Sequence, residues 1–270
     1  MQRLFKNIIG AFLSESAPQA IRRYLGTSSW ESRADEEPSR ASMDDEDLLK
    51  GLGPLYHGYS FFGVANEQLP GMYELNQQAK APIITAYLAY AIAKSRNKAT
   101  DPVSFIELFC ADGYYTMVAS RLGCCNSIGI DNNRDGHLQK ARHIADRLGI
   151  KSVTFTEQEI TEDADFDAAD VIANIGGLYH VNKPREILRL SYEKAKKFLI
   201  VQTVVSLAST DENYFEAPAP GWTWGNRYSR ESFDKMIHEV CPGVIDCHYN
   251  ELEGNGRPED RGSVYYLIRK

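Results

Sequence analysis

Residues 106–114 of the chain read Ile-Glu-Leu-Phe-Cys-Ala-Asp-Gly-Tyr, and within this stretch an apolar run ends and a helical pattern begins. The apolar run covers residues 103–109, and the helical pattern runs from Tyr115 to Leu122. A buried strand followed by a short turn and a helix is the repeating unit of a parallel α/β sheet. The stretch therefore predicts the fold class, and it predicts that ligands bind where the strand ends.

The same alternation continues along the chain. Helical patterns cover Arg134–Leu148 and Lys183–Lys196, and they lie between short apolar runs. Strands that alternate with helices indicate a parallel sheet with right-handed crossovers and with helices on both faces. The further apolar runs that we predict to be strands cover residues 127–130, 152–156, 170–175 and 197–205.

The C-terminal part departs from this alternation. Ser229 is the predicted cap of a helix over residues 230–240, and the strand-like runs Val244–Tyr249 and Ser263–Arg269 follow that helix. The connection between the two runs is rich in glycine, proline and charge and has no helical pattern. Because a parallel pair needs a long crossover, we predict that these last strands are antiparallel neighbours.

Composition limits the class of protein and its partners. The 270 residues are 43% hydrophobic and 25% charged, so the chain can bury a core without disulfides or metals. A formal charge of -7 argues against a generally basic surface for nucleic acid. The five cysteines contain no CxxC pair, which predicts reduced thiols in a cytoplasmic protein and no metal site. The longest apolar run near the N-terminus, Ile8 to Leu13, is far shorter than the roughly 20 residues of a membrane span, so we expect no membrane partner.

We predict three parts in the chain. Residues 1–50 alternate basic and apolar positions and then become acidic, which indicates a helical arm followed by a mobile linker. The arm would pack on the domain or on a second subunit, so a homo-oligomer is one expected state. Residues 51–100 contain an aromatic segment over residues 55–73, the lid segment, which we expect to cover the site. A helix over Lys80–Arg96 follows it. Residues 101–270 form the predicted catalytic domain.

From about residue 100 to the end, the chain resembles the class I S-adenosylmethionine-dependent methyltransferases. The resemblance implies a Rossmann-like sheet that is mostly parallel with a reversed last strand, and S-adenosylmethionine as the cofactor. It also implies that Glu107 is the acidic residue at the end of the first strand and that Gly113 is the last glycine of the nucleotide loop. Phe109 and Ala111 occupy positions where the family usually has glycine, and side chains there restrict the backbone.

Asp131 follows Gly113 by eighteen residues and ends the second predicted strand. An acidic side chain about 20 residues after the glycine turn is suited to the two ribose hydroxyls of a nucleotide, although an Asp there could also cap the next helix. The resemblance assigns Glu159 to the adenine amino group and Ile160 to the adenine ring, with an ordinary surface loop as the alternative. The expected cofactor-binding residues are Glu107, Phe109, Ala111, Gly113, Asp131, Asn132, Glu159, Ile160, Asn174 and Gly176.

The run Gly177-Leu178-Tyr179-His180 follows the fourth predicted strand and, by the resemblance, faces the acceptor at its end. The run is most similar to the subgroup that contains tRNA wobble-uridine (mo5U34) methyltransferase-like proteins. We predict His180 as the catalytic base, because imidazole titrates near neutral pH, and Tyr179 as a second residue of the catalytic site that orients the acceptor. The alternative is that His180 only hydrogen-bonds a neighbouring loop.

A long connection, residues 206–228, separates the fifth strand from the helix capped by Ser229, and loops of this length are usually functional or disordered. Its Trp222 and Trp224 could stack on a sugar, a base or an aromatic ring, although at least one of them could belong to the core. Arg227 could pair with a carboxylate or phosphate of the acceptor, or with a surface acid. Together with Tyr114, these residues form the expected acceptor-binding set.

These observations predict an enzyme that transfers a methyl group from S-adenosylmethionine to an oxygen or nitrogen of a small-molecule or glycan acceptor. The alternatives are a tRNA-modifying methyltransferase and, because of Phe109 and Ala111, a non-catalytic binding protein with a degenerate methyltransferase fold. An NAD-dependent dehydrogenase is the competing enzyme class. Such dehydrogenases normally keep a full Gly-x-Gly-x-x-Gly turn, of which only Gly113 is present here.

Overall fold

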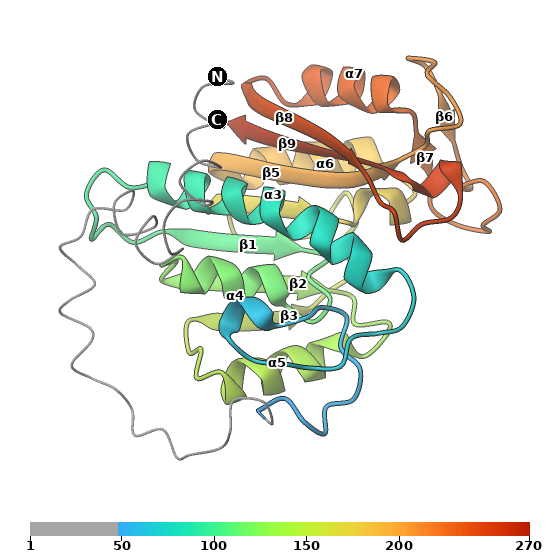
Figure 1. The fold of residues 1–270 in the computed structure, drawn as a ribbon. Coiled ribbons are helices and arrows are strands. Elements are labelled where there is room, and N and C mark those ends of the chain that lie inside the picture. The colour runs from blue at the N-terminus through green and yellow to red at the C-terminus, as the bar shows by residue number, and fades with distance from the viewer. Residues whose placement is uncertain (1–47) are drawn as a thin grey trace, which may run out of the picture. The chain divides into compact units, whose positions relative to one another are not determined.

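The structure is a computed structural model that describes residues 48–270, so the predicted N-terminal arm and acidic linker lie outside the described residues. A seven-stranded sheet forms the centre, in the order β3-β2-β1-β4-β5-β9-β8 (Figure 1). Its strands are β1 (Ser104–Leu108), β2 (Asn126–Asp131), β3 (Val153–Glu157), β4 (Ala169–Ile175), β5 (Ala195–Val205), β8 (Val244–Glu251) and β9 (Gly262–Arg269).

Strand direction divides the sheet into two parts. Strands β1 to β5 are parallel, whereas β9 runs antiparallel to both of its neighbours, β5 and β8. The predicted sheet, mostly parallel with a reversed last strand, is therefore confirmed. β9 lies inside the sheet, and every residue of it except Arg269 is buried. The reversal is possible because residues 252–261, which join β8 to β9, need no crossover helix.

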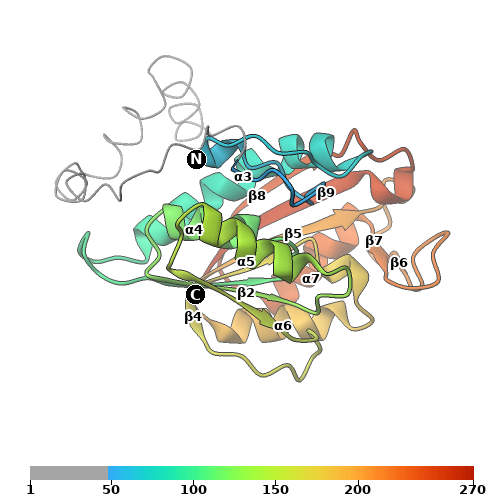
Figure 2. The same ribbon diagram turned by 90° about the horizontal axis from the view of Figure 1, so that it is seen from below.

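Helices cover both faces of the sheet, as the sequence pattern predicts (Figures 1 and 2). One face carries α3, α4 and α5, and the other carries α6 and α7. The strands supply both layers because alternate side chains point to opposite faces, so Phe105 packs in the first layer and Ile106 in the second. The helices are α3 (Tyr73–Lys94), α4 (Tyr114–Arg121), α5 (His137–Arg147), α6 (Pro184–Lys194) and α7 (Arg230–Val240).

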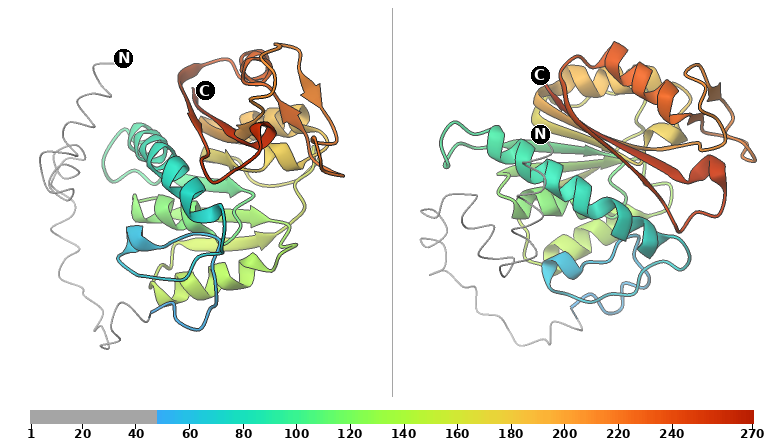
Figure 3. Two further views of the ribbon diagram at one scale, coloured as in Figure 1. Left: turned by 45° about the vertical axis from the view of Figure 1, so that its right-hand side comes forward. Right: turned by 45° about the horizontal axis from the view of Figure 1, so that its top comes forward.

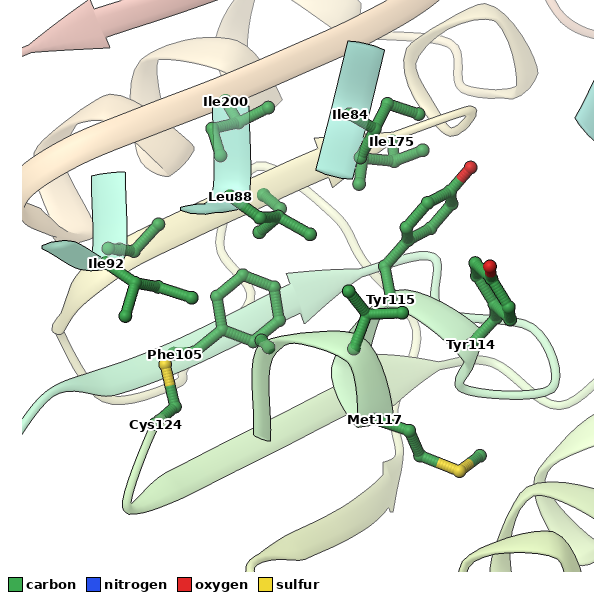
Figure 4. Close-up of a cluster of buried hydrophobic side chains, with 14 of the residues drawn as sticks. Ile84, Leu88, Ile92, Phe105, Tyr114, Tyr115, Met117, Cys124, Ile175 and Ile200 are labelled. Atoms are coloured by element: carbon green, nitrogen blue, oxygen red, sulfur yellow. The ribbon is translucent and has the colours of Figure 1, made fainter. Parts of the chain in front are cut away.

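An apolar cluster holds α3 against the strands. Phe105 of β1 lies near Leu88 and Ile92 of α3, and Ile200 of β5 belongs to the same cluster (Figure 4). These four side chains are almost completely buried. Full burial of a large apolar side chain contributes about 1.5–3 kcal/mol. The cluster therefore fixes α3 beside strands β1 and β5.

The start of α3 differs from the prediction. The helix begins at Tyr73, whereas its apolar periodicity predicts a start at Lys80. The difference arises because the first turns of α3 hold the preceding segment through polar side chains. Gln77, for example, accepts a hydrogen bond from the backbone N of Gly58 and donates one to its carbonyl oxygen. An apolar pattern cannot reveal turns that are held in this way.

The start of α5 also differs from the prediction. The helix begins at His137, after the predicted start at Arg134. Asn133 has a φ of 56°, which is a turn conformation, and its side-chain oxygen accepts a hydrogen bond from the backbone N of Leu138. Asn adopts this left-handed conformation more readily than most residues, so the chain turns there before the helix begins.

Residues 48–72, which precede α3, lie beside α5 and α4 (Figure 3, blue). On α5, Lys140 Nζ donates a hydrogen bond to the carbonyl oxygen of Pro54, and Arg147 donates one to that of Leu48. A short 3-10 helix covers Ser60–Phe62. Most of the predicted lid segment is thus packed on the domain.

The connection between β5 and α7 contains two short strands, β6 (Phe215–Glu216) and β7 (Arg227–Tyr228), which pair antiparallel. Two further 3-10 helices cover Leu178–His180 and Pro258–Asp260. Within residues 48–270, none of the helices is long and apolar enough to span a bilayer. The same part of the chain holds no group of three or more His, Cys, Asp or Glu side chains that could bind a metal ion.

Gly113 marks a close approach between the turn after β1 and strand β3. Its φ is 77°, and a Cβ atom at this position would overlap Cε1 of Phe155. A side chain at position 113 would therefore face both a conformational cost and a steric clash.

We expect Gly113→Ala to lower the free energy of unfolding by about 2–5 kcal/mol. About 1–2 kcal/mol comes from the left-handed backbone and about 1–3 kcal/mol from overpacking against Phe155. Gly149→Ala is the matched control, because Gly149 has a φ of 65° but no atom within 4 Å of the place that its added methyl group would take. Urea denaturation of both variants measures the difference, and equal losses would contradict the contact between the turn and β3.

Candidate active site

The turn from β1 to α4 contains three residues in the left-handed region of backbone conformation. Phe109 has a φ of 63°, Ala111 a φ of 47° and Gly113 a φ of 77°. The first two are the positions where the sequence departs from the glycines of the resembling family, so the backbone keeps a glycine-like path without glycine. A left-handed conformation costs an L-residue roughly 1–2 kcal/mol. The surrounding packing must offset that cost.

The ring of Phe109 provides part of that packing. A Cβ atom on Gly177 would overlap the Phe109 ring, so the ring occupies the space that a side chain at 177 would need. The ring also packs against the apolar cluster on the α6 and α7 face. The turn after β1 and the segment after β4 are thereby joined through an aromatic ring.

Glu107 lies near the end of β1 and is only 2% exposed. Its side chain points toward α4, where Thr116 Oγ1 donates a 2.6 Å hydrogen bond to Oε2. Burial, with smaller contributions from the negative charges of Asp112 and Asp131, raises the pKa of Glu107 to about 8. A positively charged neighbour would lower the pKa of this carboxyl group, because it would favour the ionised form.

Asp131 ends β2 beside the same turn. Its carboxylate accepts hydrogen bonds from the backbone N of Ala111 at 3.1 Å and from that of Asn133 at 2.8 Å. A carboxylate has about four lone-pair positions, so Asp131 can accept further hydrogen bonds from a ligand. The side chain of Asn132 donates a hydrogen bond to Glu159 at 3.1 Å, which links two further residues expected to bind the cofactor. Ile160 is buried in the apolar cluster on the α6 and α7 face.

The remaining two expected cofactor residues are Asn174, near the end of β4, and Gly176, which directly follows the strand. The side chain of Asn174 donates a hydrogen bond to Ser191 on α6, so its amide is directed to that helix. Gly176 has a φ of 70°, and its backbone N donates to the carbonyl oxygen of Gln202. The side-chain oxygen Oε1 of Gln202 is buried without a hydrogen-bond partner among the described residues. That oxygen lies 3.8 Å from the Cβ position of Gly176, so the segment offers a free acceptor next to a residue without a side chain.

A cavity of about 290 Å³ adjoins the end of β5 and the segment after β4, and none of the residues expected to bind the cofactor lines it. Its walls come from the lid segment, α3, the 3-10 helix after β4, the long connection 206–228 and residues 252–260. The residues expected to contact the acceptor or to act in catalysis line it, with one exception. Those that line it are Tyr179, His180, Trp222, Trp224 and Arg227.

Tyr114 is the exception, because it does not line this cavity. Its side chain is 4% exposed and packs against the ring of His57, which itself lines the cavity. Its position at the start of α4 points it into the layer between that helix and the lid segment. The tyrosine therefore lies behind the cavity wall.

Aromatic side chains dominate one wall of the cavity. The ring of His180 stacks on Trp224, with ring centroids 5.0 Å apart and planes 22° apart. Trp222 and Trp224 are 45% and 42% exposed, so neither is a core residue. Desolvation of the His180 ring by the surrounding protein, together with nearby positive charges that include Arg227, lowers its pKa to about 4. His180 is therefore neutral at pH 7 but weakly basic.

Arg227 is a buried arginine whose hydrogen-bonding groups are largely used within the protein. Its Nε and one terminal nitrogen donate to Oδ1 of Asp260 at 2.9 and 2.5 Å, and the guanidinium lies 5.1 Å from the ring centre of Tyr179. The arginine thus holds two walls of the cavity together. The sequence predicts either a surface acid or the acceptor as the partner of Arg227. In the structure the partner is Asp260, a partly buried acid that lines the cavity.

Two side chains that prove central to the site are not predicted from the sequence. The first is His57 of the lid segment, which lines the cavity and binds the buried carboxylate of Asp112 through its ring Nδ1 at 2.5 Å and its backbone N at 2.9 Å. The available signals were an acid inside the nucleotide loop and a histidine inside an aromatic segment. Neither signal indicates that the two residues meet.

Lys80 is the second side chain of the cavity wall that the sequence does not reveal. Burial lowers its pKa to about 8. The lysine is thus a source of positive charge at the cavity, on the first half of α3.

Comparison with known proteins places the chain in a family. Residues 99–241 match the family described as a methyltransferase domain. The chain belongs to this family. The match confirms the prediction of a methyltransferase and of an enzyme. A search of curated protein sequences finds no significant match.

Solved structures of similar fold include other methyltransferases. Magnesium protoporphyrin IX methyltransferase from Synechocystis PCC 6803, solved with SAH bound, is 10% identical, with a TM-score of 0.57 over 76% of this chain and 90% of that one. The N-terminal domain of EvdMO1, solved in the presence of SAH and D-fucose, is 16% identical, with a TM-score of 0.57 over 84% and 99%. The cyclase SpnF is 15% identical, with a TM-score of 0.51 over 72% and 82%. These likenesses confirm the Rossmann-like methyltransferase fold of the family.

We expect Glu107→Gln to change how stability depends on pH. Native Glu107 keeps its proton up to about pH 8, whereas the unfolded side chain loses it near pH 4. The folded wild type therefore binds more protons between these values and loses stability as the pH rises. The Gln variant lacks this loss, so its stability relative to the wild type should increase from pH 5 to pH 8, by a total of a few kcal/mol.

Urea denaturation at several pH values measures this difference. The difference between variant and wild type isolates Glu107, because the other titrating groups are shared. Glu253→Gln is the control, since Glu253 is exposed. A pH-independent difference for Glu107→Gln would mean that this carboxyl group titrates normally.

Proposed function

We propose that this protein transfers a methyl group from S-adenosylmethionine to an oxygen or nitrogen of a small-molecule or glycan acceptor. The observation that carries the proposal is that His57 lines the cavity and hydrogen-bonds Asp112, which lies in the turn that follows Glu107 and that Asp131 binds. The cofactor supplies a methyl group on a positively charged sulfur, and the protein supplies alignment and proton transfer.

The residues at the strand ends fit this cofactor. Glu107 would face the ammonium group, whose charge favours the ionised form of a carboxyl that is otherwise held neutral. Asp131 has free acceptor positions for ribose hydroxyls, and Glu159 is exposed beside it for the adenine amino group. The unpartnered Oε1 of Gln202 and the open space at Gly176 support a ligand in this segment.

The departures at Phe109 and Ala111 are compatible with cofactor binding. They motivate the alternative of a non-catalytic binding protein, because bulky residues could block the cofactor. The ring of Phe109, however, packs against Gly177 and the apolar cluster, and the backbone of both residues keeps the left-handed path. The side chains of Phe109 and Ala111 are therefore no argument against cofactor binding.

The cavity favours a small acceptor. Its volume of about 290 Å³ lies near the lower end of the range for small-molecule pockets. The exposed rings of Trp222 and Trp224 suit a sugar or an aromatic ring, and Tyr179 lines the same cavity. His180 stays a candidate for the catalytic base, with its low pKa as the argument against it.

A tRNA acceptor is the second candidate. The observation that favours it is the similarity of Gly177-Leu178-Tyr179-His180 to the wobble-uridine subgroup. The cavity could also receive a base that stacks on a tryptophan. Against it, the charge of -7 gives little support for the broad phosphate contacts that tRNA binding requires.

Asp131→Ala should weaken binding of S-adenosylhomocysteine about 10- to 100-fold, which corresponds to roughly 1.4–2.8 kcal/mol. The loss is expected because the carboxylate would no longer accept the ribose hydroxyls. Asp135→Ala is the matched control, because Asp135 is exposed in the turn before α5. Isothermal titration calorimetry measures both affinities. Unchanged affinity in Asp131→Ala would remove this residue from the cofactor site.

Trp224→Ala should raise the KM for the acceptor about tenfold while the affinity for S-adenosylhomocysteine stays the same. The reason is that the ring lines the cavity and stacks on His180, whereas the residues expected to bind the cofactor do not line the cavity. The acceptor is first identified with radiolabelled S-adenosylmethionine and a panel of monosaccharides, phenols and total tRNA. Affinity for tRNA that falls steeply between about 50 and 200 mM salt would favour the second candidate.

A further inference from the structure

We propose that His57, held by the buried carboxylate of Asp112, is the general base that removes a proton from a hydroxyl acceptor. The inference rests on the proposed methyl transfer and adds to it the residue that accepts the proton and the kind of acceptor atom. It is carried by the position of His57 at the cavity wall and of the fully buried Asp112 behind its ring.

The carboxylate fixes the state of the imidazole ring. Asp112 is fully buried, which alone would raise its pKa, but the positive charge and hydrogen bonds of His57 outweigh this effect and lower the pKa. Asp112 is therefore ionised at neutral pH and can only accept hydrogen bonds. Because Nδ1 of His57 lies 2.5 Å from Oδ1, Nδ1 must carry the hydrogen. In its neutral state the ring therefore has its lone pair on Nε2, which is the form that can accept a proton.

The ring is also held in position by its neighbours. Tyr114 of α4 stacks on it, with centroids 4.9 Å apart and planes 19° apart, and Tyr115 meets it edge-on at 5.5 Å. Figure 4 shows these two tyrosines side by side at the start of α4. From its own segment, Tyr56 lies 4.8 Å away. Burial raises the pKa of all three tyrosines, so they stay neutral at pH 7 and act on the ring through packing alone.

The position of Asp112 connects the base to the cofactor loop. Asp112 directly precedes Gly113 in the turn after β1, and Tyr59 donates a 2.8 Å hydrogen bond to the carbonyl oxygen of Asp112. His57 lines the cavity, and its Nε2 has no hydrogen-bond partner within the described residues. The lid segment thus brings a proton acceptor to the loop that would hold the methyl donor.

His180 is the other histidine of the cavity wall, and its surroundings differ. No carboxylate lies behind its ring within the described part of the chain, and the positive charges of Arg227, Lys80 and Arg134 add to the effect of burial in lowering its pKa to about 4. A base with that pKa accepts a proton weakly at pH 7. Its stacking on Trp224 suits a role in holding the acceptor.

The proposed reaction is a single displacement. The acceptor hydroxyl loses its proton to Nε2 of His57 as its oxygen forms a bond to the methyl carbon. The bond between that carbon and the sulfur breaks, and its electron pair stays on the sulfur. Asp112 stabilises the imidazolium that results, and the imidazolium then releases its proton to solvent. The products are the methyl ether and S-adenosylhomocysteine.

The decisive variant is His57→Asn. The amide nitrogen of Asn can take the place of Nδ1 and keep the hydrogen bond to Asp112, while the proton acceptor at Nε2 is lost. We expect kcat to fall about 10²- to 10⁴-fold, with the thermal midpoint and the affinity for S-adenosylhomocysteine nearly unchanged. The wild-type kcat should rise with pH as the imidazole loses its proton, and the variant should lack that rise.

Two matched variants separate His57 from the other histidines. His180→Asn should raise the KM for the acceptor and leave the pH dependence of kcat in place. His143→Asn, in an exposed position on α5, should behave like the wild type. Asp112→Asn should lower kcat with retained cofactor binding, because Asp112 is a positioning residue. Retained kcat in His57→Asn, or loss of the pH dependence only in His180→Asn, would overturn the proposal.

A measurement without acceptor completes the test. In protein labelled with ¹⁵N-histidine, the ring signals of His57 should show the hydrogen on Nδ1, and Asp112→Asn should change them. A ring whose single hydrogen is on Nε2 would contradict the proposal. Wild-type protein that fails to bind S-adenosylhomocysteine would instead contradict the proposed function, which keeps the two failures distinct.

Discussion

The turn between β1 and α4 is the constraint on which the rest of the site depends. Three of its five residues have left-handed backbone conformations, and two of these are not glycine. This path sends Glu107 toward α4, brings the backbone of Gly113 against Phe155 of β3, and lays the ring of Phe109 on Gly177. Strands β2 and β3 and the segment after β4 each contact the turn or its side chains, so the strain of the turn is held by the sheet around it.

Three carboxyl groups surround this turn, and the structure gives each a different electrostatic state. Burial keeps Glu107 protonated up to about pH 8, whereas His57 keeps Asp112 ionised, and two backbone N–H groups bind Asp131. If all three carboxyl groups were ionised and shielded from water, their negative charges would repel one another. Separate partners let one region hold a neutral acid, a paired acid and an acid open to ligands. Such a division suits a cofactor that carries both signs of charge.

The cavity combines parts of the chain that are distant in sequence. The lid segment and α3 supply one side, and the connection 206–228 and residues 252–260 supply the other. An ion pair and hydrogen bonds join these parts: Arg227 binds Asp260, and Asn76 of α3 binds Asn255. The aromatic wall at Trp222 and Trp224 remains exposed because no apolar partner covers it in this part of the chain.

The sequence by itself determined the α/β sheet, its reversed strand, the family and the acidic strand ends. These features follow from local sequence patterns, which are apolar periods of about 2 or 3.6 residues and acids at a set spacing from a glycine turn. Only the tertiary structure decided where α3 begins, where the ring of Phe109 packs, and that His57 meets Asp112 across 55 positions of the chain. The physical reason is that these contacts join polar or aromatic groups from distant segments. Such contacts leave no period in the sequence and form only once the sheet has brought the segments together.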